Sequence, residues 1–282
     1  MVDRARQERG PSHFNRAEPS ASDRLPHDRG PDGADSSTRV VYGVGPVREL
    51  LARGAVHRLF IDRSRASKAG QDPVVELAKQ AQAARIPVEF CPREELDQLA
   101  GEDARHQGVL AQTAGLHYRA LDELLPASGH ALLVALDGVE DPRNLGAILR
   151  SAYLLGAHGV IIPEHRAAEV TPVTTKASAG ASELLPIAKV GNLVRALEEL
   201  KAAGVWTVAV HDSPTSRPIA TIDAAMPVCL VLGAEGHGVR PLVAKSCDFH
   251  AVIPMARSEI GSFNVSVAAA LALYDIASRR GR

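Results

Sequence analysis

Hydrophobic and polar positions are distributed unevenly along the chain, and residues 1–37 stand apart from the rest. They contain Pro, Gly, Ser, Asp and Arg with almost no large aliphatic side chains. Such a stretch buries too little apolar surface to offset the entropy lost on ordering, so the pattern predicts a disordered tail. Because the tail holds six Lys and Arg against seven Asp and Glu, a solvated tail is favoured over a basic arm that contacts nucleic acid.

Residues 38–113 alternate short apolar runs with amphipathic stretches. The runs predict strands near Val40, at 56–61, in "PVEF" and in "GVLAQT". Helices are predicted between them, and one has Asp72 as its N-cap and Pro73 in its first turn. Strands alternating with helices over about 75 residues predict a small α/β domain.

Residues 114–130 are interpreted as a linker, and residues 131–282 predict a larger α/β domain. The run "ALLVALDGV" is continuously apolar, as in a strand of a parallel sheet that is covered on both faces. Further strands are predicted in "GVIIP", "VWTVAV", "PVCLVLG" and "HAVIP". Helices are predicted after Asn144, in "VTTKASAGAS", in "NLVRALEELKAAG" and from Asn264 onwards.

Composition narrows the class of protein. The 282 residues suit two domains, and 45% hydrophobic residues can supply a core. A net charge of -1 argues against a polybasic protein held on nucleic acid by bulk charge, although a local basic patch is compatible with it. Three separated cysteines without a CxxC pair argue against a disulfide framework or a thiolate zinc site.

The expected location follows from what the sequence does not contain. No apolar run approaches the ~20 residues that span a bilayer, and the N-terminus has no signal-peptide pattern. The histidines show no helical metal-site spacing, so no bound metal is expected. We therefore expect a cytoplasmic protein without a membrane segment, in which His106, His211 and His237 are hydrogen-bonded loop residues.

The first segment that can carry chemistry follows the strand in "ALLVALDGV". A helix is predicted near Asn144, and Arg143 and Arg150 fall on one face of it, just beyond the end of the strand. Open α/β sheets bind ligands at this edge, and arginine suits phosphate. A capped amphipathic helix with solvated arginines is an equally weighted alternative.

The second segment is the glycine-rich stretch "CLVLGAEGHGVR", in which Glu235 lies among glycines that follow a buried strand. Glycines there let the backbone approach a ligand, and a carboxylate can orient an amine or a hydroxyl. The order GxxGxG departs from the dinucleotide fingerprint GxGxxG, and Pro241 comes before any clear helix start. A generic glycine-rich turn is the alternative interpretation.

The third segment, "IPMARSEIGSFNVSVAAALALYDIASRR", places Ser262 and Asn264 before an alanine-rich helix. Either residue could be a simple N-cap, or the helix start could hold an anionic ligand group. The helix is apolar on more than one face, which indicates burial in a core or against a second protomer.

In chain order, the three segments resemble the three motifs of the SpoU family of RNA 2′-O-ribose methyltransferases. The matching residues are Asn144 and Arg150, then Gly233, Glu235 and Gly236, then Ile253-Pro254-Met255 and Ser262-Phe263-Asn264-Val265-Ser266. Residues 38–113, with "YGVGPVRELL" and "RHQGVLAQ", also resemble the RNA-binding domain of TrmH-like and RlmB-like rRNA guanosine methyltransferases. The resemblance covers nearly everything after the tail.

The resemblance implies a parallel sheet with helices on both faces, a C-terminal trefoil knot and a homodimer with the active site near its interface. S-adenosylmethionine is the implied cofactor, held by Gly233, Ile253 and Phe263. The implied catalytic and RNA-positioning residues are Asn144, Arg150, Glu235, Ser262 and Asn264. Phe263 departs from the usual Leu, which could reshape the adenosine pocket.

The implied activity is 2′-O-methylation of RNA, with a guanosine of 23S rRNA as the expected target. The preceding domain favours rRNA, because tRNA-specific members of this type often lack it. A tRNA 2′-O-methyltransferase and a non-catalytic RNA-binding assembly factor are the alternatives. A serine hydrolase is not supported, because the sequence has no GxSxG elbow.

Overall fold

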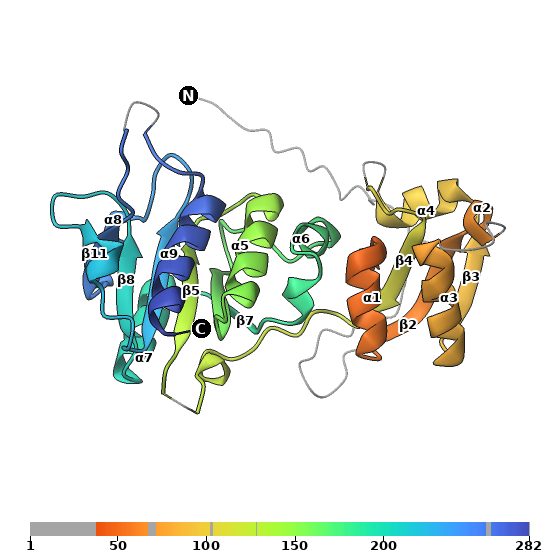
Figure 1. Cartoon of the computed structure of the whole chain (residues 1–282), viewed down its shortest axis with the longest axis horizontal. Coiled ribbons are helices and arrows are strands. Elements are labelled where there is room, and N and C mark those ends of the chain that lie inside the picture. The colour runs from red at the N-terminus through yellow and green to blue at the C-terminus, as the bar shows by residue number, and fades with distance from the viewer. Residues whose placement is uncertain (1–37, 67–71, 102–103, 128, 258–260, 282) are drawn as a thin grey trace, which may run out of the picture. The chain divides into compact units, whose positions relative to one another are not determined.

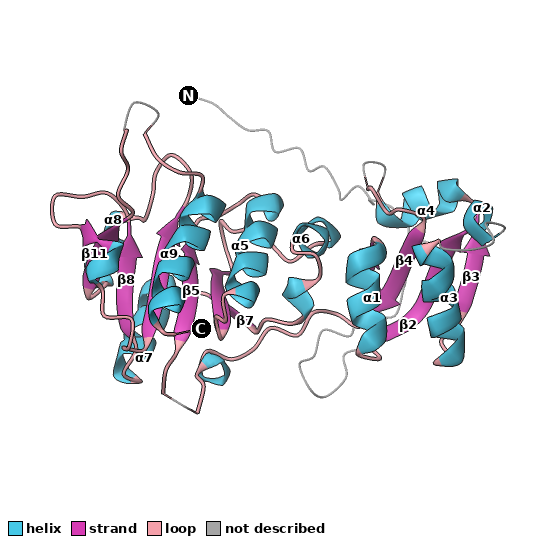
Figure 2. Ribbon diagram, viewed as in Figure 1, coloured by secondary structure: helices cyan, strands magenta, loops and turns pink. Residues whose placement is uncertain are grey.

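The computed structural model contains two sheets, each with its own helices (Figures 1 and 2). The tail predicted for 1–37 lies outside the described residues. Within the described part of the chain, no helix is both long and apolar enough to cross a membrane. The structure describes residues 38–66, 72–101, 104–127, 129–257 and 261–281.

The first sheet has four strands in the order β1-β4-β2-β3 among the described residues. Strand β4 runs antiparallel to β1 and β2, whereas β3 runs parallel to β2. The strands are β1 (Arg39–Tyr42), β2 (Val56–Asp62), β3 (Val88–Cys91) and β4 (Val109–Thr113). The helices are α1 (Val44–Ala52), α2 (Arg63–Ala66), α3 (Pro73–Ala83) and α4 (Arg93–Ala100).

Local sequence signals account for the start of α3. The Asp72 carboxylate accepts a hydrogen bond from the backbone N–H of Val74 at 2.9 Å, and Pro73 occupies the first helical position. Both features were predicted from the sequence. An N-cap side chain accepts a hydrogen bond from a backbone N–H of the first turn that has no partner within the helix, and proline at the first position has no N–H to leave unpaired.

The second sheet is parallel throughout, with seven strands among the described residues in the order β7-β6-β5-β10-β8-β11-β9. Two strands were not predicted: β7, whose run "IAKV" is short, and β9, which has two residues. The bounds are β5 (Leu132–Asp137), β6 (Gly159–Pro163), β7 (Ile187–Val190), β8 (Trp206–Val210), β9 (Arg217–Pro218), β10 (Val228–Gly233) and β11 (Phe249–Val252).

Helices cover both faces of this sheet. Leu230 and Leu232 of β10 pack with residues of α5 and α9, whereas the alternate residues Cys229 and Val231 pack with α7 and α8. This alternation explains the continuously apolar strands, because each face has its own core. The helices are α5 (Pro142–Leu154), α6 (Pro172–Ala177), α7 (Leu193–Ala202), α8 (Pro241–Ser246) and α9 (Val265–Arg279), with 3₁₀ turns η1 (Asp122–Leu124), η2 (Ala181–Glu183) and η3 (Ile219–Thr221).

Two helices begin at a proline that was not predicted as a helix start. Helix α5 begins at Pro142 rather than near Asn144, because Asp141 caps it by accepting from the N–H of Arg143 at 2.8 Å. Helix α8 begins at Pro241, where the sequence predicts no clear helix. In both helices proline stands at the first position, where its missing N–H costs nothing.

The strand order brings the sequence motifs together. From β5 the chain moves outwards through β6 to β7, whereas β10 pairs with the other edge of β5. Ligands of open parallel sheets bind beyond the carboxyl ends of the strands where the order reverses. The segments that follow β5 and β10 meet there. The predicted α/β class with a parallel sheet is therefore confirmed, while the trefoil knot stays a prediction.

Candidate functional site

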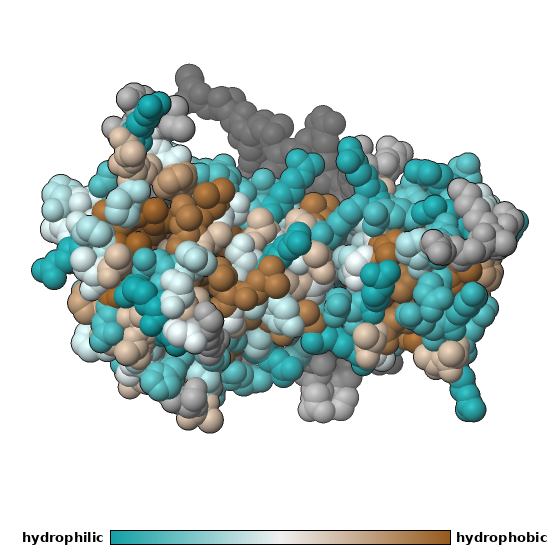
Figure 3. Space-filling model, viewed as in Figure 1, coloured by the Kyte–Doolittle hydropathy of each residue, from teal (hydrophilic) through white to brown (hydrophobic). Residues whose placement is uncertain are grey.

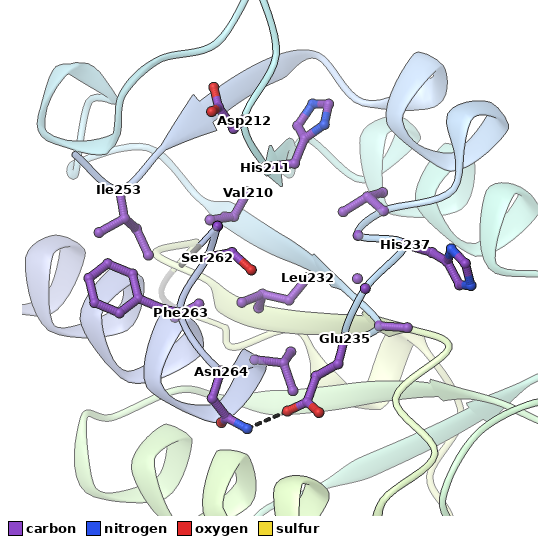
Figure 4. Close-up of a pocket in the computed structure, with 18 of the residues that line it drawn as sticks. Val210, His211, Asp212, Leu232, Glu235, His237, Ile253, Ser262, Phe263 and Asn264 are labelled. Atoms are coloured by element: carbon purple, nitrogen blue, oxygen red, sulfur yellow. Dashed lines mark hydrogen bonds between the residues drawn. The ribbon is translucent and has the colours of Figure 1, made fainter. Parts of the chain in front are cut away.

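A cavity of about 600 Å³ opens at the carboxyl ends of β8, β10 and β11 (Figure 4). Its wall includes the ends of these strands, the turn 233–238 and the segment 261–265, which leads into α9. We call residues 233–238 the glycine turn. The volume lies within the range of cavities that hold cofactors and drug-sized ligands.

The glycine turn folds back on itself at the cavity wall. The N–H of Gly238 donates to the carbonyl oxygen of Ala234 at 2.9 Å. A Cβ added at Gly233 would lie 1.9 Å from the carbonyl carbon of Gly238, so the close approach excludes any side chain there. Gly236 and Gly238 have φ angles of 85° and 63°, which glycine adopts without strain.

Three motif side chains from distant parts of the chain meet beside this turn. The Nδ2 atom of Asn144, in the first turn of α5, donates to Oε1 of Glu235 at 3.0 Å. The Nδ2 atom of Asn264 donates to the same carboxylate oxygen (Figure 4) and also to Oδ1 of Asn144, at 3.2 Å in the latter contact. We call these three residues the amide–carboxylate cluster.

Asn264 combines the two roles that the sequence left open. Its Oδ1 atom caps α9 by accepting from the N–H and the hydroxyl of Ser266, at 2.9 and 2.6 Å. This cap orients the side-chain amide, so that its Nδ2 faces Glu235. The N-cap therefore positions the same residue for the amide–carboxylate cluster.

The predicted cofactor residues all line the cavity. Gly233 lies at the end of β10 and Ile253 follows β11, while Phe263 precedes the cap of α9. Ser262 also lines the cavity. Phe263 is 41% exposed, so a large apolar ring is available at this wall.

Two predicted site residues, Asn144 and Arg150, do not line the cavity. Asn144 is still joined to the cavity wall by hydrogen bonds with Glu235 and Asn264, whereas Arg150 lies further along α5. It is exposed and does not line the cavity. It follows Asn144 by six residues on α5, which corresponds to about 9 Å along the helix axis. Within a single chain, Arg150 is therefore not part of the cavity wall.

Two further cavity residues, His211 and Asp212, were not assigned to the site from the sequence. They follow β8, and β8 lies next to β10 only because of the strand order, which no local pattern reveals. The rings of His211 and His250 share a hydrogen bond of 2.9 Å between Nε2 and Nδ1. Burial, reinforced by His250, lowers the pKa of His211, which favours its neutral form.

The charged groups of the cavity wall are unevenly distributed. The carboxylates of Glu235 and Asp212 both line it, and so do His211 and His237, whereas no lysine or arginine among the described residues does. Such a wall favours a ligand that carries positive charge. Among the described residues, no group of three or more His, Cys, Asp or Glu could hold a metal ion.

Comparison with known families divides the chain at the same place as its two sheets. Residues 131–274 match the model of the SpoU rRNA Methylase family. Residues 40–119 match the model described as RNA 2'-O ribose methyltransferase substrate binding.

Two curated relatives match over most of this chain and most of their own length. The chain is 42% identical over 211 residues to a putative TrmH family tRNA/rRNA methyltransferase, YacO, of Bacillus subtilis, which covers 73% of this chain and 82% of the relative. It is 37% identical to an uncharacterized tRNA/rRNA methyltransferase of Mycobacterium marinum, over 96% of this chain and 87% of the relative.

Solved structures show a similar arrangement. The SpoU methyltransferase AviRb of Streptomyces viridochromogenes, crystallised with AdoMet, matches with a TM-score of 0.70 and 27% identity, over 86% of this chain and 90% of that one. An AdoMet-bound rRNA methyltransferase of Sinorhizobium meliloti matches with a TM-score of 0.71 and 26% identity, over 86% of this chain and 87% of that one.

Proposed function

Because this chain belongs to the SpoU rRNA methylase family of RNA methyltransferases, we propose that it methylates the 2′-hydroxyl of a ribose in 23S rRNA. The observation that carries the proposal is the amide–carboxylate cluster. Asn144, Glu235 and Asn264 converge beside a cofactor-sized cavity at the reversal point of the sheet. They come from all three motif segments, which are separated by up to 120 residues.

The cavity fits S-adenosylmethionine in size and in charge. Its volume of about 600 Å³ suits a nucleoside with an amino-acid arm. The bare backbone at Gly233 allows close contact, and the carboxylates of Glu235 and Asp212 oppose positively charged sulfonium and ammonium groups. Gly233, Ile253 and Phe263 would hold the cofactor, which supplies an electrophilic methyl group.

The residues of the chain then have to activate and place a poor nucleophile. A ribose 2′-hydroxyl loses its proton to solvent water as its oxygen attacks the methyl group, and negative charge develops on that oxygen before the bond is complete. Arg150 would stabilise this charge rather than accept the proton, because the guanidinium pKa lies far above neutral pH. Asn144, Glu235 and Asn264, with Ser262, would orient the ribose and the arginine.

Arg150 does not line the cavity of its own chain, so a second chain is the source considered for the arginine. The helix faces beside Arg150 are apolar and exposed: Figure 3 shows hydrophobic atoms gathered over α9 and α5. We infer that a second copy of this chain covers this face and that Arg150 of the partner subunit enters the cavity. The exposed apolar side chains are Tyr153 and Leu154 of α5 and Val267, Leu271 and Tyr274 of α9.

The substrate proposal rests on the first domain. Residues 40–119 match a substrate-binding family model, and the resemblance implies that tRNA-specific members often lack such a domain. A guanosine of 23S rRNA is proposed as the target, and tRNA is the competing substrate.

The test is to map ribose methylation in rRNA and tRNA from cells with and without this protein. We expect one 2′-O-methylguanosine of 23S rRNA to disappear, and the purified protein with S-adenosylmethionine to restore it in vitro. Loss of a tRNA methyl group instead would move the substrate to tRNA. Unchanged methylation, together with no heat of S-adenosylmethionine binding by calorimetry, would identify a non-catalytic RNA-binding factor.

A further inference from the structure

An ion pair between a buried carboxylate and a half-exposed arginine lies directly behind the glycine turn. Asp137 is the last residue of β5, and its side chain has no exposed surface. Its partner is Arg240, the residue that precedes α8 and whose side chain is 53% exposed. Neither residue lines the cavity. The pair can therefore act on the site only through the chain that connects it to the turn.

Asp137 forms hydrogen bonds at both ends of the glycine turn. Its backbone carbonyl oxygen accepts from the N–H of Ala234 at 3.0 Å, where the glycine turn begins. Its carboxylate accepts from the backbone N–H of Arg240 at 2.7 Å, just after the turn ends. The Nε and Nη2 atoms of Arg240 donate to the other carboxylate oxygen at 2.7 and 2.6 Å.

These hydrogen bonds offset the free-energy cost of burying the Asp137 carboxylate. A buried carboxylate needs a charged partner and further hydrogen-bond donors, and here Arg240 supplies both. An ion pair with a half-exposed guanidinium adds little net stability, because water competes for the exposed part. The pair instead fixes the distance between the two ends of the glycine turn. This matters because glycine-rich backbone has few conformational preferences of its own.

Glu235 needs this support because its own surroundings are open. It is exposed, and the donors that contact it are the side-chain amides of Asn144 and Asn264. Fixing residues 234 and 240 fixes the backbone from which Glu235 projects and the wall formed by the glycine turn. An error of about 1 Å in such a placement can cost about 100-fold in rate.

We propose that Asp137 and Arg240 are positioning residues for methyl transfer, acting together as a clamp on the glycine turn. The clamp holds Glu235 towards Asn144 and Asn264 and shapes the cofactor wall at the end of β10. This inference rests on the proposed function of the site, but the clamp itself can be measured without any RNA.

The test compares the variants Asp137→Asn, Arg240→Ala and Arg240→Lys with the matched control Arg195→Ala. Arg195 is an exposed arginine of α7 that pairs with Glu199 at 2.9 Å. Amide hydrogen exchange at residues 234–240 is measured in the full chain, together with S-adenosylmethionine affinity, kcat and KM. We expect Asp137→Asn and Arg240→Ala to accelerate exchange of the turn about tenfold and to lower kcat by about 10- to 100-fold.

Two further comparisons separate the clamp from other roles. Arg240→Lys should recover part of kcat, since a lysine can still reach the carboxylate from this position. The double variant Asp137→Asn/Arg240→Ala should be no worse than the poorer single variant, because both changes remove one interaction. Arg195→Ala should match the wild-type protein in every measurement.

Three outcomes would overturn the clamp. The first is lower thermal stability with unchanged exchange of the turn and unchanged kcat, which indicates a purely structural pair. The second is a higher KM for RNA in Arg240→Ala alone, which indicates direct RNA contact by Arg240. The third is additive losses in the double variant. A wild-type protein that methylates no RNA would instead reject the proposed function, while the exchange measurement would still report on the clamp.

Discussion

Asn144 and Asn264, 120 residues apart in the chain, are joined by a hydrogen bond of 3.2 Å and both donate to Glu235. Only a carboxylate accepts both amides without offering a competing donor. Replacing Glu235 with Gln keeps the size of the side chain but introduces an NH₂ group into a cluster of donors.

We therefore predict that Glu235→Gln lowers kcat by about 10- to 100-fold through lost placement. The affinity for S-adenosylmethionine should change less, because most of the cavity wall is intact. Steady-state kinetics with calorimetry of cofactor binding measures the two effects. Ser246→Ala, at the last residue of α8 and outside the cavity lining, is the control. Wild-type kcat in Glu235→Gln would remove Glu235 from the proposed machinery.

Arg150 gives a prediction that depends on two chains. Arg150→Ala should abolish methyl transfer while leaving S-adenosylmethionine binding nearly intact, because Arg150 is outside the cavity of its own chain. If Arg150 of the partner subunit completes the site, mixing Arg150→Ala with Glu235→Ala should restore activity. In the mixed dimer, one of the two sites then combines an intact Arg150 with an intact Glu235.

The measurement is transfer of a tritiated methyl group to rRNA by each variant alone and by the co-expressed pair. Restored activity requires sites built from both chains. Two inactive variants that stay inactive when co-expressed would argue that each chain supplies its own arginine. An active Arg150→Ala variant would remove the arginine from the reaction.

Much of this site could be predicted from short stretches of sequence. The cap of α3 by Asp72 and the cap of α9 by Asn264 depend on neighbouring residues, which is why both were predictable. The resemblance to the SpoU motifs then identified Gly233 and Phe263, which both line the cavity.

What could not be predicted depends on which strands become neighbours. His211 reaches the cavity because β8 pairs with β10, and Asp137 meets Arg240 across 103 residues. No periodicity in the sequence contains that information. Pro241 was interpreted as evidence against a following helix, but α8 begins at this residue. Proline disrupts the interior of a helix but is favoured at its first position.

The apolar face of α9 gives a prediction about assembly. Leu271 is 39% exposed on α9, and a glutamate there would place a charge in the proposed interface. We predict that Leu271→Glu shifts the protein from dimer to monomer in light scattering after size-exclusion chromatography. Leu242→Glu is a matched control, because Leu242 is 68% exposed on α8, at the other face of the sheet.

Circular dichroism should show both glutamate variants folded. A dimer that survives Leu271→Glu, or one that is lost in Leu242→Glu, would place the interface elsewhere. Loss of methyl transfer should accompany loss of the dimer if Arg150 of the partner subunit is required.

The glycine turn should not tolerate even the single methyl group that alanine adds at Gly233. Gly233→Ala would place a Cβ 1.9 Å from the carbonyl carbon of Gly238, so the turn must open. We expect at least a tenfold loss of S-adenosylmethionine affinity, since the turn forms part of the cavity wall. Gly45→Ala in α1 is the control, because a Cβ there meets no atom within 4 Å. Unchanged affinity in Gly233→Ala would show that the cofactor does not use this wall.

The His211–His250 pair predicts a pH dependence of stability. Burial, then His250, lowers the pKa of His211 below its ordinary value of 6.5, with Asp212 opposing the shift. Between the folded and unfolded pKa values the unfolded chain binds more protons. The stability that neutral His211 contributes is therefore complete above about pH 6.5 and is lost as the pH falls through the folded pKa.

Urea unfolding of the wild-type protein and of His211→Asn at pH 7.5, 6.5 and 5.5 tests this assignment. The difference in unfolding free energy between the two proteins should shrink below pH 6.5, because only the wild-type protein has to protonate a disfavoured imidazole. His250→Asn removes the second cause but leaves burial, so it should reduce the pH dependence only in part. A difference that stays constant from pH 7.5 to 5.5 would mean that His211 titrates alike in the folded and unfolded chains. If His250→Asn abolished the pH dependence altogether, its cause would be the interaction of His211 with His250 rather than the burial of His211.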